Sequence, residues 1–133
     1  AYATDADQVY FLYADEDDDS GALTTNANLH CVVSIGGTDY ITDLGIVVAA
    51  ATNYRLGITI DSDRKAAAWV NGVQYSLTHN TTAGGVQTGT GTQKSLALTD
   101  NVDLIPYVGI KQQSGNARDM SLAYVKMSRI IFE

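Results

Sequence analysis

An Asn71-Gly72 pair between two short runs of β-forming residues constrains this chain more than any other feature of its sequence. Both central positions of a type I′ turn need positive φ, which Asn and Gly tolerate, so the pair predicts a two-residue hairpin turn. Upstream, Tyr54, Leu56, Ile58 and Ile60 alternate with other residues, which is the period of a strand with one apolar face. We therefore predict a meander of three antiparallel strands near 54–60, 65–70 and 73–78.

Short β-forming runs bounded by turn residues recur along the rest of the chain, whereas helical periodicity is nearly absent. The alternation and the turn residues predict an all-β chain that forms an antiparallel sandwich. Its length of 133 residues favours a single domain over 1–133. The segment 46–51 is compatible with a short strand or with a helical turn. The further predicted strands cover 8–14, 29–35, 38–42, 104–110 and 117–132.

Two segments have too little to bury for a core and are predicted to be loops. Residues 15–21 form an acidic loop, and residues 79–94 form an exposed Gly- and Thr-rich loop, where binding residues are often found. Charge is uneven, because residues 1–54 contain nine acids and no base. The net charge of −7 disfavours nucleic-acid binding. The longest apolar run, 46–51, is far shorter than the roughly 20 residues that a membrane helix needs.

The residues that usually carry catalysis or bind metals are scarce. Cys31 is the only cysteine, which excludes an intramolecular disulfide and a CxxC zinc site. His30 is its neighbour in a predicted strand, so the two side chains point to opposite faces, and we expect Cys31 to be buried and structural. A glycosidase needs a spaced pair of carboxylates, but the only glutamates are Glu16 and Glu133. We expect no catalytic residues, and a protein that is not an enzyme.

The acidic loop is the only dense carboxylate cluster, and hard cations such as calcium prefer oxygen ligands. Its weak metal candidates are Asp15, Asp17 and Asp19. The EF-hand pattern fails here, because the glycine comes too late and no glutamate closes a twelve-residue loop. We therefore expect no cofactor, with calcium as the alternative.

Candidate binding or interface residues lie in the meander and in the 79–94 loop. Trp69 is compatible with stacking on a sugar or with a place in the core. The triplet Asn80-Thr81-Thr82 matches an N-glycosylation acceptor. The candidate interface residues are Trp69, Asn80, Thr81 and Gln87.

Four stretches together resemble a known superfamily. They are Tyr-Arg-Leu-Gly-Ile-Thr-Ile-Asp at 54–61, Val-Asn-Gly-Val at 70–73, Ile-Pro-Tyr-Val-Gly-Ile at 105–110 and Ala-Arg-Asp-Met-Ser-Leu-Ala-Tyr at 117–124. The chain resembles concanavalin A-like (laminin G-like) jelly-roll proteins, and more narrowly the structural proteins of tailed bacteriophage virions. This resemblance implies an antiparallel jelly-roll sandwich. Such proteins usually have strands before the first one here, so the sandwich is either shortened at its N-terminus or a C-terminal piece.

The resemblance also implies a task. It indicates a non-enzymatic capsid decoration (cement) protein that binds the major capsid protein or another virion protein, made in the host cytoplasm and placed on the virion surface. The alternatives are a carbohydrate-binding, lectin-like module with a glycan ligand, or a receptor-binding fibre or tail part. The resemblance favours a homo-oligomer, a trimer in particular. The charge asymmetry and the polar loop suggest that its contacts involve residues 1–19 or 79–94.

Overall fold

A computed structural model describes residues 6–14, 23, 27–81, 89–99, 105–106 and 121–128. The chain divides into two compact units, one of residues 3–104 and one of residues 1–2 and 105–133. The described residues form strands and no helix, so none of them lies in a helix able to cross a membrane. All strands belong to the 3–104 unit: β1 (Gln8–Tyr13), β2 (Asn28–Ile35), β3 (Thr38–Val47), β4 (Leu56–Ile60), β5 (Ala66–Val70) and β6 (Val73–Tyr75).

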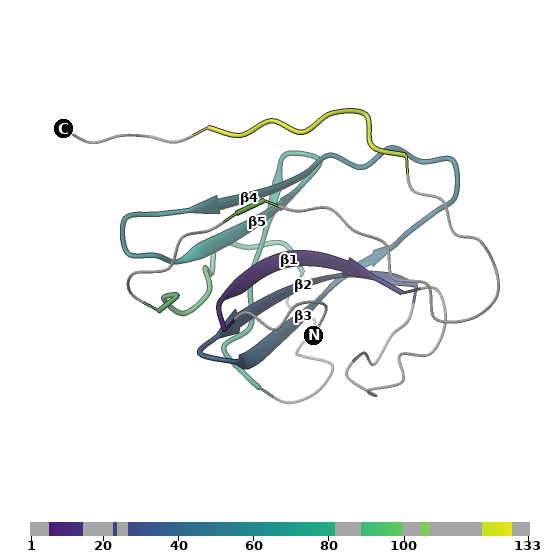
Figure 1. Cartoon of the computed structure of the whole chain (residues 1–133). Coiled ribbons are helices and arrows are strands. Elements are labelled where there is room, and N and C mark those ends of the chain that lie inside the picture. Colours follow the sequence, from purple (N-terminus) through teal and green to yellow (C-terminus); the bar gives the residue numbers. More distant parts are fainter. Residues whose placement is uncertain are drawn as a thin grey trace. The chain divides into compact units, whose positions relative to one another are not determined.

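The first sheet has the order β1-β2-β3 and is antiparallel throughout (Figure 1). The β2–β3 hairpin turns at Gly36 and Gly37, which have φ values of 56° and 82°. Glycine adopts this left-handed backbone more readily than any residue with a side chain, so the Gly-Gly pair favours the turn at this position. The strands predicted over 8–14, 29–35 and 38–42 are thereby confirmed, although β3 runs on to Val47 and takes up the first part of the undecided 46–51 segment.

A β-bulge interrupts the β2–β3 ladder. His30 pairs with Asp43 and Leu29 pairs with Ile46, so Leu44 and Gly45 are the extra residues. Gly45 has a φ of 67°, and its N–H donates to the Asp43 carboxylate at 2.7 Å. The bulge leaves Leu44 only 2% exposed in the core, and it places Asp43 beside His30 on the opposite face of the sheet.

The second sheet is the predicted meander, with the order β4-β5-β6, although its last strand ends at Tyr75 and not at residue 78. Asn71 and Gly72 have φ values of 52° and 85°, which are the positive values that a type I′ turn requires. The backbone N–H of Asn71 donates to the Arg55 carbonyl at 2.8 Å, and the Asn71 side chain accepts from the Arg55 N–H at 2.9 Å. The predicted hairpin is therefore confirmed, and its asparagine also ties the turn to the chain just before β4.

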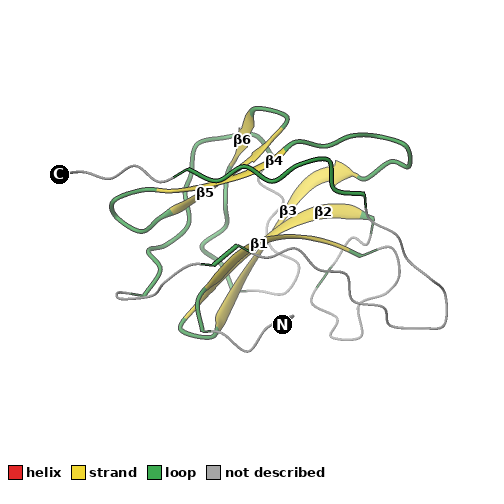
Figure 2. Ribbon diagram, turned by 45° about the horizontal axis from the view of Figure 1, so that its top comes forward, coloured by secondary structure: helices red, strands yellow, loops and turns green. Residues whose placement is uncertain are grey.

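Figure 2 shows the strands of the two sheets. Side chains from both sheets belong to one hydrophobic core cluster. On β5 the inner face carries Ala66, Ala68 and Val70, each at most 3% exposed. These small side chains leave room for larger core residues to pack against the β5 backbone. The described residues thus form an all-β, sandwich-like fold. The core cluster comprises Leu29, Cys31, Val33, Leu44, Ala68, Val70, Leu77 and Leu98.

The segment after β6 folds back beside that strand. Leu77 N–H donates to the Gln93 carbonyl at 2.9 Å, and Gly91 N–H donates to the Gln74 carbonyl at 3.1 Å. Ser95 and Leu98 are then buried, at 3% and 1% exposed. The described part of the predicted 79–94 loop is therefore a return segment whose side chains are mostly exposed, and it continues into the core.

The Asp7 carboxylate joins three parts of the 3–104 unit. One of its oxygens accepts from the Gly36 N–H at 3.0 Å and from the Thr99 hydroxyl at 3.1 Å. Next to it, the Gly37 N–H donates to the Ala6 carbonyl at 2.8 Å. Since Asp7 is only 8% exposed, these bonds hold the start of β1 against the β2–β3 turn and the segment that ends at Thr99.

Two sequence predictions differ from the structure. Residues 105–106 and 121–128, inside the strands predicted over 104–110 and 117–132, belong to no strand. Alternation alone does not make a strand, because a strand needs a paired neighbour, and these residues have no ladder partner among the described ones. The acidic loop 15–21 lies outside the described residues, and the single domain over 1–133 stays a prediction.

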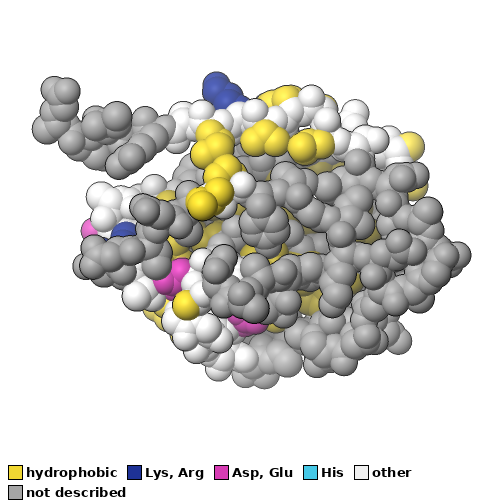
Figure 3. Space-filling model, viewed as in Figure 1, with side chains coloured by type: hydrophobic (Ala, Val, Ile, Leu, Met, Phe, Trp, Pro, Cys, Tyr) yellow, Lys and Arg dark blue, Asp and Glu magenta, His cyan; other side chains and the backbone are white. Residues whose placement is uncertain are grey.

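Apolar side chains also reach the surface of the described part (Figure 3).

Candidate functional site

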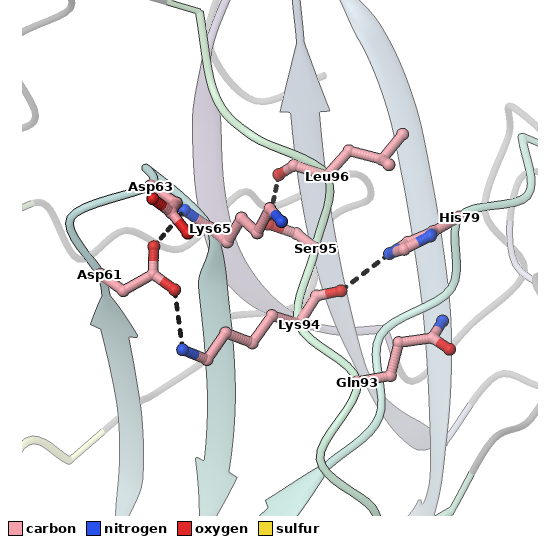
Figure 4. A pocket seen from close by; sticks show the side chains of 8 residues that line it. All are labelled: Asp61, Asp63, Lys65, His79, Gln93, Lys94, Ser95 and Leu96. Atoms are coloured by element: carbon pink, nitrogen blue, oxygen red, sulfur yellow. Dashed lines mark hydrogen bonds and ion pairs between the residues drawn. The ribbon is translucent and has the colours of Figure 1, made fainter.

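An open pocket of about 360 Å³ lies in the 3–104 unit where the β4–β5 turn meets the return segment (Figure 4). The turn supplies one wall, and the chain around residues 79 and 93–96 supplies the other. Most of its side chains are charged or polar. The lining residues are Asp61, Asp63, Lys65, His79, Gln93, Lys94, Ser95 and Leu96.

Asp61 organises the β4–β5 turn. Its carboxylate accepts from the Lys65 N–H at 2.9 Å, and its carbonyl accepts from the Arg64 N–H at 3.0 Å. Arg64 has a φ of 60°, so the tight turn leaves one residue in the left-handed region. An aspartate that closes its own turn in this way is typical of a polar Asp-Ser-Asp segment. The turn therefore fixes where the Asp61 carboxylate points.

Asp61 and Lys94 form an ion pair across the pocket, with an N–O distance of 2.7 Å. The hydrogen bond from Lys94 is the main reason that the pKa of Asp61 lies below its ordinary value, and the Lys65 N–H lowers it further. Both side chains are partly exposed, so water and salt weaken the pair. The pair therefore sets the charge pattern of the pocket more than it stabilises the fold.

In the wall around residues 79 and 93–96, the other polar side chains donate hydrogen bonds to backbone carbonyls. His79 Nε2 donates to the Lys94 carbonyl at 2.8 Å, and Gln93 Nε2 donates to the Leu77 carbonyl at 2.6 Å. The Ser95 hydroxyl accepts from the Ala66 N–H at 2.8 Å and donates to the Leu96 carbonyl at 2.7 Å. The bond from Ala66 holds the return segment against the start of β5, and the bonds of His79 and Gln93 hold it against residues 77–79.

The arrangement suits binding better than catalysis. A serine nucleophile needs a base that takes its proton, but Ser95 donates to a carbonyl and His79 donates its own Nε2 proton to another. What remains accessible is a mixed set of carboxylate, ammonium and amide groups. Among the described residues no group of three or more His, Cys, Asp or Glu side chains is placed to hold a metal ion. The pocket is thus equipped to hydrogen-bond a small polar molecule.

Most residues predicted to bind lie elsewhere. Trp69 is half-buried on the outer face of β5, where its Nε1 donates to the Thr59 hydroxyl at 3.2 Å, so it belongs neither to the core cluster nor to the pocket. Asn80 and Thr81 are exposed beside the pocket residue His79 but do not line it. Gln87 and the metal candidates Asp15, Asp17 and Asp19 lie outside the described residues.

Sequence reasoning did not find the Asp61–Lys94 pair. The two residues are 33 positions apart, and no spacing rule links a turn residue to a loop residue at that distance. The one available signal is the Asp61-Ser62-Asp63 segment, whose polar residues predict a turn but not the partner of its carboxylates.

Cys31 is fully buried in the core, as predicted. Burial raises the pKa of its thiol to about 12, so the group is protonated and unreactive near neutral pH. His30 belongs to the opposite face of the sheet, where it pairs with Asp43 in the ladder. The prediction that these neighbours do not form a catalytic pair agrees with this placement.

His30 is a structural residue as well. It is fully buried, and its Nδ1 donates to the Asn28 carbonyl at 3.0 Å. Its Nε2 lies 3.9 Å from an Asp43 oxygen and has no hydrogen-bond partner among the described residues. A side chain without solvent contact cannot meet a substrate, so we place it with Asn28 and Asp43 in a buried polar cluster.

The geometry defines a class, an antiparallel β-sandwich-like protein with an open polar pocket at one turn. Comparisons with protein-family models, with curated proteins and with solved structures found nothing that matches the chain.

Proposed function

We propose that this chain is a non-enzymatic structural protein of a tailed-bacteriophage virion, a decoration (cement) protein on the outer capsid shell with a concanavalin A-like jelly-roll topology. The stretches that resemble such proteins at 54–61 and 70–73 fall on β4 and on the β5–β6 turn of an antiparallel fold, which supports the proposal. Its partner is the major capsid protein or another virion protein, and its location is the virion surface.

Exposed apolar side chains on strands carry the proposal. Val47 at the end of β3 is 67% exposed, and Leu56, Ile58 and Ile60 on β4 are 43%, 37% and 39% exposed. Apolar groups held on a rigid sheet favour protein–protein contacts. The hydrogen bonds in the pocket support the non-enzymatic part of the proposal, because Ser95 and His79 each donate to a backbone carbonyl and not to each other.

Quantitative mass spectrometry of purified particles whose genome encodes this chain tests the proposal. We expect copies in the hundreds per particle, because a decoration protein follows the repeat of the shell. A few copies per particle would assign it to a fibre or to the tail, and its absence from the particle would overturn the proposal.

The pocket favours a second candidate, a carbohydrate-binding module. Sugar hydroxyls pair well with the amide, carboxylate and ammonium groups of Gln93, Asp63 and Lys94, which line one pocket. A glycan array tests it with the whole chain and the variant Asp63→Ala, with Asn80→Ala as a control outside the pocket. Binding lost only in Asp63→Ala would support this candidate, and no binding by the unaltered chain would remove it.

A further inference from the structure

The open edge of β4 is the strongest unassigned feature of the described residues. β4 stands at one end of its sheet and pairs with β5 alone among the described strands. Edge strands are usually protected by lysine, proline or a bulge. The β4 sequence Leu-Gly-Ile-Thr-Ile contains none of these. Such an edge can accept a further strand.

The backbone groups of Leu56, Ile58 and Ile60 face this open edge. At the two ends of the ladder, Asn71 N–H donates to the Arg55 carbonyl and Asp61 N–H donates to the Lys65 carbonyl. The odd-numbered residues therefore form the hydrogen-bonded pairs with β5. In an antiparallel ladder the pairs alternate, so the even-numbered residues point their N–H and C=O groups away from β5.

The same three residues form an apolar row. Their ladder partners are Val70, Ala68 and Ala66, which are buried on the inner face of β5. Paired residues share a face, so the row belongs to the inner face, yet each member remains 37% to 43% exposed. Among the described residues no strand pairs with the outward backbone groups of β4, and the side chains of its apolar row are only partly covered.

We propose that β4 pairs with β4 of a second copy of this chain, antiparallel and about a two-fold axis through Ile58. In this register each Ile58 faces Ile58 of the other copy, and Leu56 faces Ile60. Each of these pairs exchanges both of its N–H···O bonds, as the outward direction of the even-numbered residues requires. The two apolar rows then complete each other, which makes the strand self-complementary as a two-fold interface demands.

Charge complementarity favours this partner and this register, although the Asp61 carboxylate also accepts hydrogen bonds from Lys94 and from the Lys65 N–H of its own copy. The residues that flank β4 are Arg55 and Asp61, and centring on Ile58 places Arg55 of each copy opposite Asp61 of the other. Within the described residues no carboxylate forms an ion pair with Arg55, so its guanidinium is available to a second copy. A shift by two residues would lose these opposite-charge pairs. The proposal goes beyond the proposed function and does not depend on it.

This interface differs from the trimer that the resemblance implies, which would use residues 1–19 or 79–94. Pairing of one strand with itself closes after two copies. The interface is small, so we expect a weak, concentration-dependent dimer.

Cysteine cross-linking of the full-length chain tests the register. Residues of a hydrogen-bonded pair have Cα atoms about 5.5 Å apart, within the range that a disulfide spans. Under mild oxidation Ile58→Cys should therefore form a dimer through residue 58. Leu56→Cys alone should cross-link at least about 10-fold less, whereas a mixture of Leu56→Cys and Ile60→Cys should cross-link between the two variants. Efficient self-cross-linking of Leu56→Cys and not of Ile58→Cys would overturn the register.

Light scattering of the unaltered chain and of Ile58→Lys tests the surface itself. The unaltered chain should become dimeric as its concentration rises from about 1 µM to about 500 µM, and Ile58→Lys should stay monomeric, since two lysines would meet at the axis. Val47→Lys is the matched control, an exposed apolar residue on β3, and should still form dimers. A monomer at every concentration, a trimer, or a dimer that Ile58→Lys leaves intact would overturn the proposal. If Ile58→Lys does not fold, the cross-linking result decides. Slow hydrogen exchange at the β4 amides of a monomer would show that the chain's own residues cover the edge. This result would also overturn the proposal.

Discussion

The side-chain amide of Asn28 donates to both carboxylate oxygens of Asp43, with both N–O distances at 3.0 Å, in the buried polar cluster between β2 and β3. Asn28 is 6% exposed and Asp43 is 4% exposed. A buried carboxylate is costly unless hydrogen bonds replace its water, and here the amide of Asn28 and the N–H of Gly45 do so.

Asn28→Ala should lower the free energy of unfolding by about 1–3 kcal/mol, because it leaves the buried Asp43 carboxylate with one hydrogen-bond donor fewer. Urea denaturation followed by circular dichroism measures this. Asn53→Ala, at an exposed asparagine, is the control and should change stability by less than about 0.5 kcal/mol. Equal effects of the two variants would contradict the assigned role of Asn28.

Gly72→Val should destabilise the protein by about 1–3 kcal/mol, because a β-branched side chain is strained at a φ of 85°. The new Cβ would also lie 3.3 Å from Arg55 Nη2. Gly57→Ala is the control, since Gly57 lacks a positive φ and its Cβ would meet only the Trp69 Cβ at 3.5 Å. Thermal and urea unfolding of both variants should separate them, and a similar loss in Gly57→Ala would count against a specific effect of the turn.

The stability of the protein should fall as the pH rises above 9. The pKa of the Cys31 thiol is about 12 in the folded chain and 9.0 in its ordinary state, so only the unfolded chain loses this proton between those values. The contribution is complete below pH 9 and is lost progressively up to pH 12. Cys31→Ala should show a shallower decline in urea midpoint over pH 8–11. Identical slopes would contradict the raised pKa.

Lys94→Met should raise the pKa of Asp61 towards its ordinary value of 3.8, because the hydrogen bond from Lys94 is the main cause of the lowering. A lowered pKa in the folded state stabilises the protein above the ordinary value, and this stabilisation disappears as the pH falls through the folded value. Carboxyl NMR titration from pH 2 to 6 measures the shift. Lys65→Met keeps the backbone N–H that Asp61 accepts, so it should move the Asp61 pKa much less. An unchanged Asp61 pKa in Lys94→Met would exclude the ion pair.

The hairpins were predictable because their information is local. Asn71-Gly72 and Gly36-Gly37 specify their turns within two residues, and alternation on either side supplies the strands. The buried thiol of Cys31 followed from the same pattern. A strand also needs a partner that can lie far away in the sequence, and alternation does not reveal that partner. The strand prediction is therefore wrong for residues 121–128, which belong to no strand.

The pocket was not predictable for the same physical reason. Asp61 and Lys94 meet only because the return segment runs beside β6 and then crosses the end of β5. The Leu44-Gly45 bulge was missed as well, since Gly45 gave no turn signal of its own. Trp69 was assigned to stacking or to the core, and the structure places it on the outer face of β5, where Thr59 accepts its indole proton.

The Asp7 carboxylate, which accepts from Gly36 N–H and from the Thr99 hydroxyl, has a consequence for how the chain folds in time. These contacts span 29 and 92 residues, so they cannot form until long stretches of backbone have already been gathered. The two hairpins are fast local events on a scale of about 1–10 µs. Closing the loop from residue 7 to residue 99 costs more conformational entropy than closing either hairpin. Sandwiches of high contact order fold in milliseconds to seconds. The hydrogen bond between Thr99 and Asp7 is therefore expected to form late, after both hairpins exist, and the Asp7 carboxylate keeps part of its water until then.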